Sequence, residues 1–154
     1  MTTKTLTEQA RELLKAGGHS SLATQSSKHP GYPFASVTPY AIGEDGCPIF
    51  LFSSMATHSR NLKTDNRATL LVAEIVDDNQ LGASRVSVIG EVFPVDPEQV
   101  AACQDAYVAK NPEATRWLDF GDFSFFRMEI VDIYLIAGFG EMGWIRPEDY
   151  LEVG

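Results

Sequence analysis

The hydrophobic periodicity of the chain changes at Gly17-Gly18, and this change limits the possible folds more than any other feature. Over residues 5–16 the apolar side chains recur at the spacing of an amphipathic helix, whose apolar members are Leu6, Ala10, Leu13 and Leu14. Thr5 and Glu8 have the spacing of a capping box, and the glycine pair is a typical helix end. After it, short segments alternate with the period of two that strands require. The sequence therefore predicts one helix followed by a series of strands.

Strand-like segments fill most of the remaining chain: 20–25, 33–42, 49–53, 68–76, 85–95 and 123–136. Trp144-Ile145 could add a short edge strand. Two helical pieces lie between the strands, one at 57–64 and one beginning at Asp96-Pro97. Because strands and helices do not alternate regularly, the pattern favours a mainly β (α+β) fold, an antiparallel barrel with peripheral helices. We expect one domain over 1–154, with the helix at about 5–16 and the barrel at about 19–146.

Charge and composition exclude several classes of partner. The chain has 21 acidic and 12 basic residues, a net charge of −9, which argues against nucleic acid. No segment approaches the ~18 apolar residues of a membrane span, and the N-terminus lacks the apolar core of a secretory signal. Cys47 and Cys103 do not lie in a metal-spaced cluster and are expected to be free thiols. We therefore expect a cytoplasmic protein without a membrane partner.

The three histidines do not have the spacing of a metal-binding motif. The sequence pattern predicts His19 and His29 in turns and His58 at the start of a helix. No metal site is expected from them. Spacing alone identifies no catalytic triad, because such sites are recognised by their geometry, so no catalytic acid or base is assigned.

The segment that follows Phe52 could hold an anion. A buried strand there runs into a helix start that is rich in donors: Ser53, Ser54, Thr57, His58, Ser59, Arg60 and Asn61. Helix N-termini carry unpaired N–H groups and a positive dipole end, and arginine adds a permanent cation. These groups suit a phosphate monoester. The alternative is a surface helix with an ordinary hydroxyl cap.

A second candidate segment contains Ser36, Val37, Thr38, Pro39 and Tyr40. Pro39 cannot donate a ladder hydrogen bond, so it marks an edge or an interruption of the strand. An interruption would leave backbone groups free to face a planar ligand. An ordinary edge strand, in which proline guards against aggregation, explains the pattern equally well.

Two further stretches carry weaker signals. Arg85 begins a strand after a polar loop and could bind an anion or pair with a carboxylate. The stretch 137–145 places Phe139 and Trp144 among three glycines, which suits stacking on a conjugated ring. It could equally be a glycine-rich turn whose aromatic side chains close the barrel.

Taken in order, SSLAT, GYPFASVTPYAI, FLFSSMATHSRNLKTDNRATLLV, ASRVSVIGE and AGFGEMGWI resemble the pyridoxamine 5′-phosphate oxidase-like FMN-binding split-barrel superfamily. Within it, the chain is most similar to the haem-utilisation and general-stress branch. The resemblance covers roughly residues 10–146, and the block 50–72 and the GFGxxxWI ending are its most specific parts.

The resemblance implies a six-stranded antiparallel split barrel that forms a homodimer, with an FMN site at each end of the subunit interface. The segment Ser36 to Tyr40 would line the flavin ring and ribityl chain. Phe52, Ser53 and Ser54, with Thr57, His58, Arg60 and Asn61, would hold the phosphate. Arg85 would contact the ring region, often from the partner subunit, and Phe139 and Trp144 would close over the site.

The chain also departs from the oxidase pattern. The oxidases carry arginine and lysine where this chain has Ser36 and Thr57-His58, so the phosphate site is less basic, and vitamin B6 oxidation is not implied. The resemblance favours an FMN-dependent oxidoreductase or flavin reductase-like protein acting on a small redox substrate. Two alternatives remain: a haem-binding protein with His19, His29 or His58 as the axial ligand, and a cofactor-free binding dimer.

Overall fold

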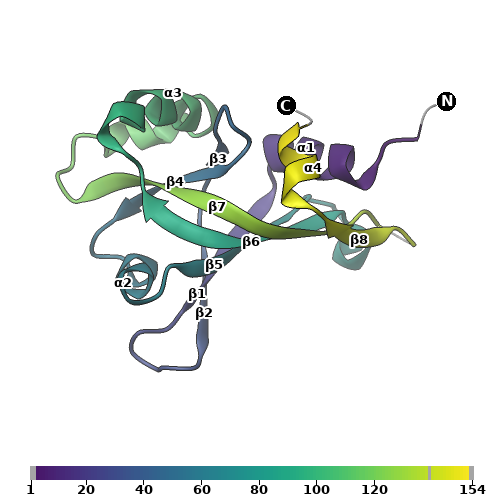
Figure 1. Cartoon of the computed structure of the whole chain (residues 1–154), viewed down its shortest axis with the longest axis horizontal. Coiled ribbons are helices and arrows are strands. Elements are labelled where there is room, and N and C mark those ends of the chain that lie inside the picture. The colour runs from purple at the N-terminus through teal and green to yellow at the C-terminus, as the bar shows by residue number, and fades with distance from the viewer. Residues whose placement is uncertain (1–2, 139, 153–154) are drawn as a thin grey trace.

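The computed structural model describes residues 3–138 and 140–152 as a strongly curved antiparallel sheet with helices around it (Figure 1). The strands are β1 (His19–Gln25), β2 (Pro33–Val37), β3 (Ala41–Ile42), β4 (Pro48–Ser53), β5 (Arg67–Ala73), β6 (Arg85–Pro94), β7 (Phe123–Ile136) and β8 (Met142–Ile145). The α-helices are α1 (Leu6–Ala16), α2 (Thr57–Thr64), α3 (Val100–Lys110) and α4 (Pro147–Glu152). The prediction of a mainly β, antiparallel split barrel with peripheral helices is confirmed.

The sheet has the strand order β2-β1-β5-β6-β7-β4-β3, and β8 pairs with the second half of β7. The described residues thus form eight strands where the sequence indicated six segments. Part of the difference arises at Pro39, which interrupts the segment 33–42. β2 before it pairs with β1, whereas β3 after it pairs with β4. The short edge strand considered at Trp144-Ile145 is present as β8.

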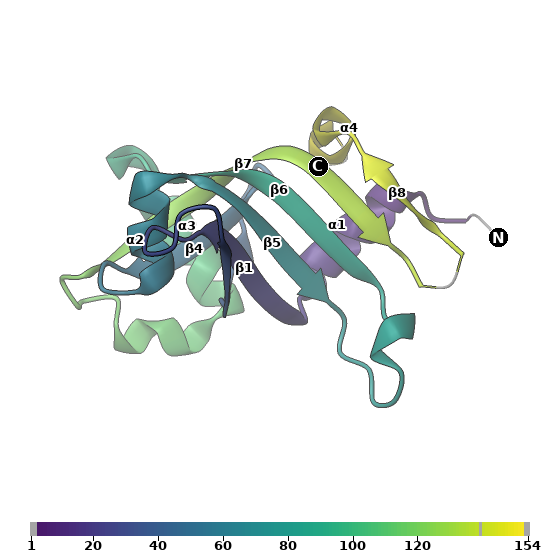
Figure 2. The same ribbon diagram turned by 90° about the horizontal axis from the view of Figure 1, so that it is seen from below.

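Helix α1 packs against the concave face of the sheet. Thr5 caps it by accepting a hydrogen bond from the Glu8 N–H at 3.1 Å, and Gly17 follows its end with a positive φ. Leu13 and Leu14 are buried in the same core cluster as Leu22, Leu70 and Val88 from the central strands. In Figure 2, α1 lies behind β5 and β6.

The opposite, convex face is covered at one end only. Helix α3 packs there on β3, β4 and the first half of β7, and Tyr107 meets the Phe125 ring edge-on at 5.7 Å. Figure 2 looks onto the central parts of β5, β6 and β7, where no helix crosses the near face.

Gly90 lies at an irregularity of the sheet. The register between β6 and β7 shifts at Ile89/Gly90, so that β7 carries one extra residue, a β-bulge. A Cβ on Gly90 would lie 2.3 Å from the backbone oxygen of Glu129. An isolated glycine in a strand often marks a bulge or a close approach of backbones, and this position shows both.

Two helical features differ from the sequence expectation. The piece beginning at Asp96-Pro97 starts as a 3-10 turn, Pro97–Gln99, before α3, and the Asp96 side chain makes no capping hydrogen bond. Helix α4 was not expected. It is held by Tyr150, whose hydroxyl donates to the Gly46 carbonyl and whose own carbonyl accepts from Arg11. No helix in the described ranges has both the length and the apolar character needed to cross a membrane.

Candidate functional site

The start of α2, directly after β4, brings several predicted phosphate ligands together, but the protein uses some of their polar groups itself. The Ser53 hydroxyl donates to Asp122 Oδ2 at 2.8 Å and accepts from the Met55 N–H at 3.2 Å. The Ser59 hydroxyl donates to the Ser53 carbonyl at 2.7 Å. The contact between Ser53 and Asp122 also places a carboxylate beside the proposed anion site, which opposes phosphate binding.

Asn61 is buried and holds α2 on the sheet. Its Nδ2 donates to Thr24 Oγ1 at 3.0 Å, while its Oδ1 accepts from both the N–H and the hydroxyl of Ser27, at 3.0 and 3.1 Å. These bonds connect the helix to β1 and to the turn that follows it. The geometry gives Asn61 a structural role in this chain.

His58 is turned towards the protein interior. Its ring lies 4.4 Å from the Phe52 ring, and its Nδ1 lies 3.4 Å from the Ser36 hydroxyl, a long contact. Its Nε2 is buried and has no partner among the described residues. Burial lowers the pKa of His58, which favours the neutral ring.

The exposed donors at the start of α2 are Ser54, Thr57 and Arg60. No described residue forms an ion pair with Arg60. With the N-terminal N–H groups of α2, these three side chains are the ones at this position that can hold a phosphate group.

The predicted segment from Ser36 to Tyr40 faces two ways. Ser36 points to α2, whereas Val37, Pro39 and Tyr40 border a surface hollow of about 340 Å³ beside the start of β1. Thr38 is buried, and its carbonyl accepts from the Ser20 hydroxyl at 2.7 Å. Tyr40 is also buried and donates to the Leu14 carbonyl, and burial raises its pKa. The other residues around the hollow are Ala16, Gly17, Gly18, His19, Ser20, Lys110, Asn111 and Glu113.

Strand register places several predicted residues together on the uncovered convex surface, because directly opposed residues share one face of a sheet. Val37, Ser21, Leu71, Ser87, Tyr134 and Trp144 form one cross-strand row. His19, Ala73, Arg85, Ile136 and Met142 form the next row. We call these two rows, together with Ala23, Thr69, Ile89 and Asp132, the outer face.

The outer face is largely apolar, and much of it is accessible. Val37 is 87% exposed, Trp144 61% and Leu71 40%. The Trp144 ring lies 4.9 Å from that of Tyr134. Arg85 donates from Nη1 to the carbonyls of Leu81 and Ala83 at 2.9 and 3.1 Å, which holds one side of its guanidinium group against the preceding loop. Phe139, the other predicted aromatic, lies outside the described residues.

The predicted residues that remain accessible therefore form two groups, whereas Thr38, Tyr40 and Phe52 are buried. The groups at the start of α2 and on the outer face belong to different surfaces, separated by the edge of the sheet at β2. Sequence reasoning did not identify Leu71 and Tyr134 as parts of a continuous surface. The period-two alternation of their strands was the available signal, but it could not indicate which face remains uncovered.

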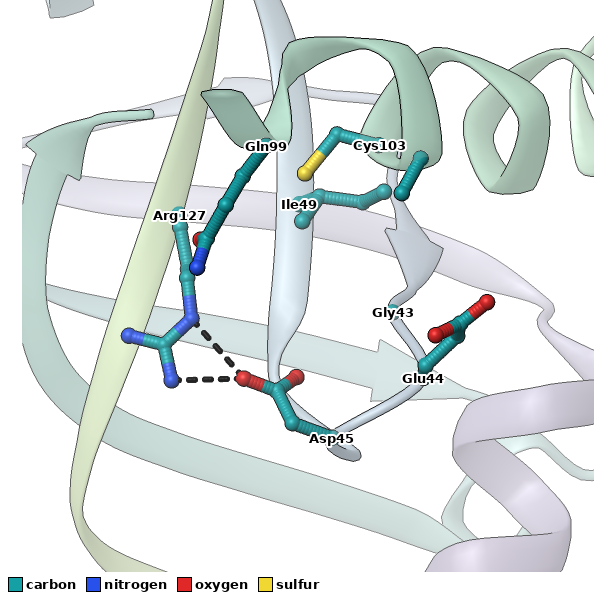
Figure 3. Close-up of a pocket in the computed structure, with 8 residues that line it drawn as sticks. Gly43, Glu44, Asp45, Ile49, Gln99, Cys103 and Arg127 are labelled. Carbon is teal, nitrogen blue, oxygen red and sulfur yellow. Dashed lines mark hydrogen bonds and ion pairs between the residues drawn. The ribbon is translucent and has the colours of Figure 1, made fainter. Parts of the chain in front are cut away.

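A separate hollow of about 220 Å³ lies under α3 (Figure 3). In it Arg127 donates to Asp45 Oδ2 from Nε and Nη2, at 3.0 and 2.7 Å, and to Cys47 Sγ at 3.3 Å. Burial alone would raise the pKa of Asp45, but hydrogen bonds from the Cys47 N–H and from Arg127 lower it below its usual value. Burial raises the pKa of Cys47 to about 11, so its thiol stays protonated. These groups satisfy one another and fix the turn between β3 and β4.

Comparison with known proteins gives a consistent family assignment. The profile of the family described as CREG, beta-barrel, matches residues 1–152. The chloroplastic non-canonical heme oxygenase HOZ of Arabidopsis thaliana is 36% identical over 131 residues, 85% of this chain and 40% of that protein. Protein CREG2 of Homo sapiens is 26% identical over 158 residues, 93% of this chain and 54% of that protein.

Among solved structures, a heme binding protein from Mycobacterium smegmatis aligns with a TM-score of 0.89 and 27% identity, over 99% of this chain and 62% of that one. The chain thus spans 40% and 54% of the two curated relatives described above.

Proposed function

The chain belongs to the CREG β-barrel family, within the FMN-binding split-barrel superfamily, and from that premise we propose that it is a haem-binding protein acting as a homodimer. This choice favours haem over FMN, the cofactor that the sequence pattern put first. The relative at 36% identity is named as a non-canonical heme oxygenase, and the structure at 27% identity is that of a heme binding protein. Bound haem supplies a redox-active iron centre.

The observation that carries the proposal is the uncovered outer face. It presents apolar and aromatic side chains, among them Val37, Leu71 and Trp144, over several neighbouring strands. A large, flat, mainly apolar macrocycle needs such a surface, because burial of apolar area is the main source of its binding free energy. Among the Asp, Glu, Lys and Arg side chains, the outer face carries Arg85 and Asp132.

The same face supports a second copy of this chain as partner. Large exposed apolar patches on soluble proteins commonly mark interaction sites. In a two-fold dimer the patch meets itself, so its central residues contact their own counterparts or near neighbours. Packing two outer faces together would cover both the apolar side chains and any cofactor that lies between them.

FMN remains the second candidate, and the exposed group of Ser54, Thr57 and Arg60 is the observation that favours it. A flavoprotein with oxidoreductase activity would hold its phosphate there. Against this, Asp122 already accepts a hydrogen bond from the Ser53 hydroxyl, and both Oδ1 and Nδ2 of Asn61 form hydrogen bonds within the chain.

A pair of titrations distinguishes these cofactors. The purified chain is titrated with ferric haem, followed by the Soret band, and separately with FMN, followed by quenching of flavin fluorescence. We expect saturable haem binding and weak or no FMN binding. Ligand at ~100-fold over its dissociation constant should stabilise the fold by about 2.7 kcal/mol, which thermal unfolding detects.

The variant Arg60→Ala serves as the matched test of the second candidate. If FMN binds through α2, this substitution should weaken it by about 1.5–3 kcal/mol, the range of a charge-assisted hydrogen bond. Haem affinity should not change. Tight FMN binding that depends on Arg60, with no haem binding, would replace the haem proposal by the flavin one.

A further inference from the structure

We propose that His19 provides the iron ligand for haem on the outer face and that Arg85 binds a haem propionate; this inference rests on the proposed function. The fit depends on donor chemistry. In many proteins a histidine imidazole holds the haem iron, and a nearby cation stabilises the haem carboxylates. The two side chains occupy one cross-strand row of an apolar surface.

The three histidines differ in whether their rings are available. His58 has a buried Nε2 and lies against Phe52 inside the protein. His29 is exposed, but it lies in the turn between β1 and β2, where its carbonyl accepts from the Tyr32 N–H at 3.1 Å. His19 is exposed and borders the 340 Å³ hollow together with Val37 and Pro39. Of the three, it alone combines accessibility with a surface that can receive a ligand.

The strand register determines the positions of His19 and Arg85 relative to each other. Both are paired with Ala73, one from β1 and one from β6, so both side chains project from the outer face. Strands are 4.7–4.9 Å apart, so the two Cα atoms are separated by about 10 Å. Ala73 between them has a small side chain, which leaves room above the strand. A flat ligand bound at His19 can therefore extend over Ala73 towards Arg85.

The hydrogen bonds of Arg85 to described residues use only one nitrogen of its guanidinium group, so the other two can bind an anion. Its Nη1 is held by the carbonyls of Leu81 and Ala83, and no described residue bonds its Nε or Nη2. No described carboxylate forms an ion pair with it. Lys110 and Glu113 also border the hollow, but the Lys110 ammonium is fixed by the carbonyls of Lys15 and Ala16.

The test uses the full chain loaded with ferric haem and compares His19→Ala with His29→Ala, which also removes one exposed imidazole. We expect His19→Ala to weaken haem binding by more than about tenfold and to shift the Soret band, because the ligand field of the iron changes. Free imidazole added to His19→Ala should restore the wild-type band. His29→Ala should behave as wild type in both measurements.

Arg85→Gln tests the carboxylate partner, with Arg67→Gln as control, since Arg67 begins β5 at the far end of the same sheet surface. Loss of a charge-assisted bond should weaken haem binding by about tenfold to 100-fold without shifting the Soret band. Arg67→Gln should leave the affinity unchanged.

The outcomes separate this inference from the proposed function. If wild type binds haem and His19→Ala keeps its affinity and spectrum, the ligand assignment is wrong while haem binding stands. A loss in His29→Ala instead would also overturn it. If wild type binds no haem, both proposals fail together.

Discussion

At the scale of single residues, the start of α2 shows how side chains typical of a binding site can serve the fold. Ser53, Ser59 and Asn61 have the residue types and spacing of phosphate ligands. Their partners are far away in sequence, such as Asp122 for Ser53 and Thr24 for Asn61. Local spacing predicts that donors gather at a helix start. It cannot predict that residues tens of positions away will engage them first.

The half-buried ring of His58, with its buried Nε2, leads to a prediction about pH. Its pKa is lowered in the folded protein, so below about pH 6.5 the unfolded chain binds more protons than the folded one, and stability falls as the pH falls. We expect His58→Leu to reduce the difference in unfolding free energy between pH 7.5 and pH 5.5, measured with urea. His29→Ala should keep the wild-type difference. An undiminished difference in His58→Leu would show that this ring does not titrate as the structure implies.

At the scale of elements, the period of the hydrophobic pattern was sufficient to predict most strands and the helices α1 and α2. The Thr5 cap and the residues 57–64 of α2 agree with the sequence pattern. Pro39 was expected at an edge or an interruption, and the structure shows the interruption, with β2 and β3 paired to different strands. Helix α4 was missed because six residues show too little periodicity. Pro147 followed by Glu148 and Asp149 was the available helix-start signal.

The β-bulge at Gly90 leads to a prediction about packing. A Cβ there would lie 2.3 Å from the Glu129 oxygen and 2.6 Å from Met128 Cγ, so the backbones of β6 and β7 would have to separate. We expect Gly90→Ala to lower the unfolding free energy by about 2–3 kcal/mol, as overpacking does in other cores. Gly121→Ala is the control, since no atom lies within 4 Å of the Cβ it would add. Equal stabilities of the two variants would contradict the close approach seen in the structure.

At the scale of the whole molecule, the sequence indicated a barrel but not which part of its surface stays open. That depends on where α1 and α3 pack: α1 fills the concave side and α3 covers only one end of the convex side. Alternation in β5 and β6 shows that two faces exist. Only the assembled helices show that Leu71, Ile89 and Tyr134 remain uncovered and that His19 and Arg85 join them in neighbouring positions.

The outer face leads to a prediction about assembly. Leu71 lies near the middle of its row, and a two-fold dimer would bring two copies of any substitution together. We expect Leu71→Lys to convert the proposed dimer into a monomer, as measured by light scattering, because like charges would be buried at the interface. Phe120→Lys places the same charge on another exposed apolar residue, outside the outer face, and should leave the dimer intact. A dimer that survives Leu71→Lys and dissociates with Phe120→Lys would locate the interface elsewhere.

The most direct test of the account is the absorption spectrum of the protein freshly purified from cells that supply both haem and FMN. We predict one intense Soret band and no flavin absorption. The outer face offers an accessible imidazole on an apolar surface, whereas several donors at the start of α2 already form hydrogen bonds within the protein. A yellow protein with the two near-visible bands of a flavin, and without a Soret band, would contradict the account.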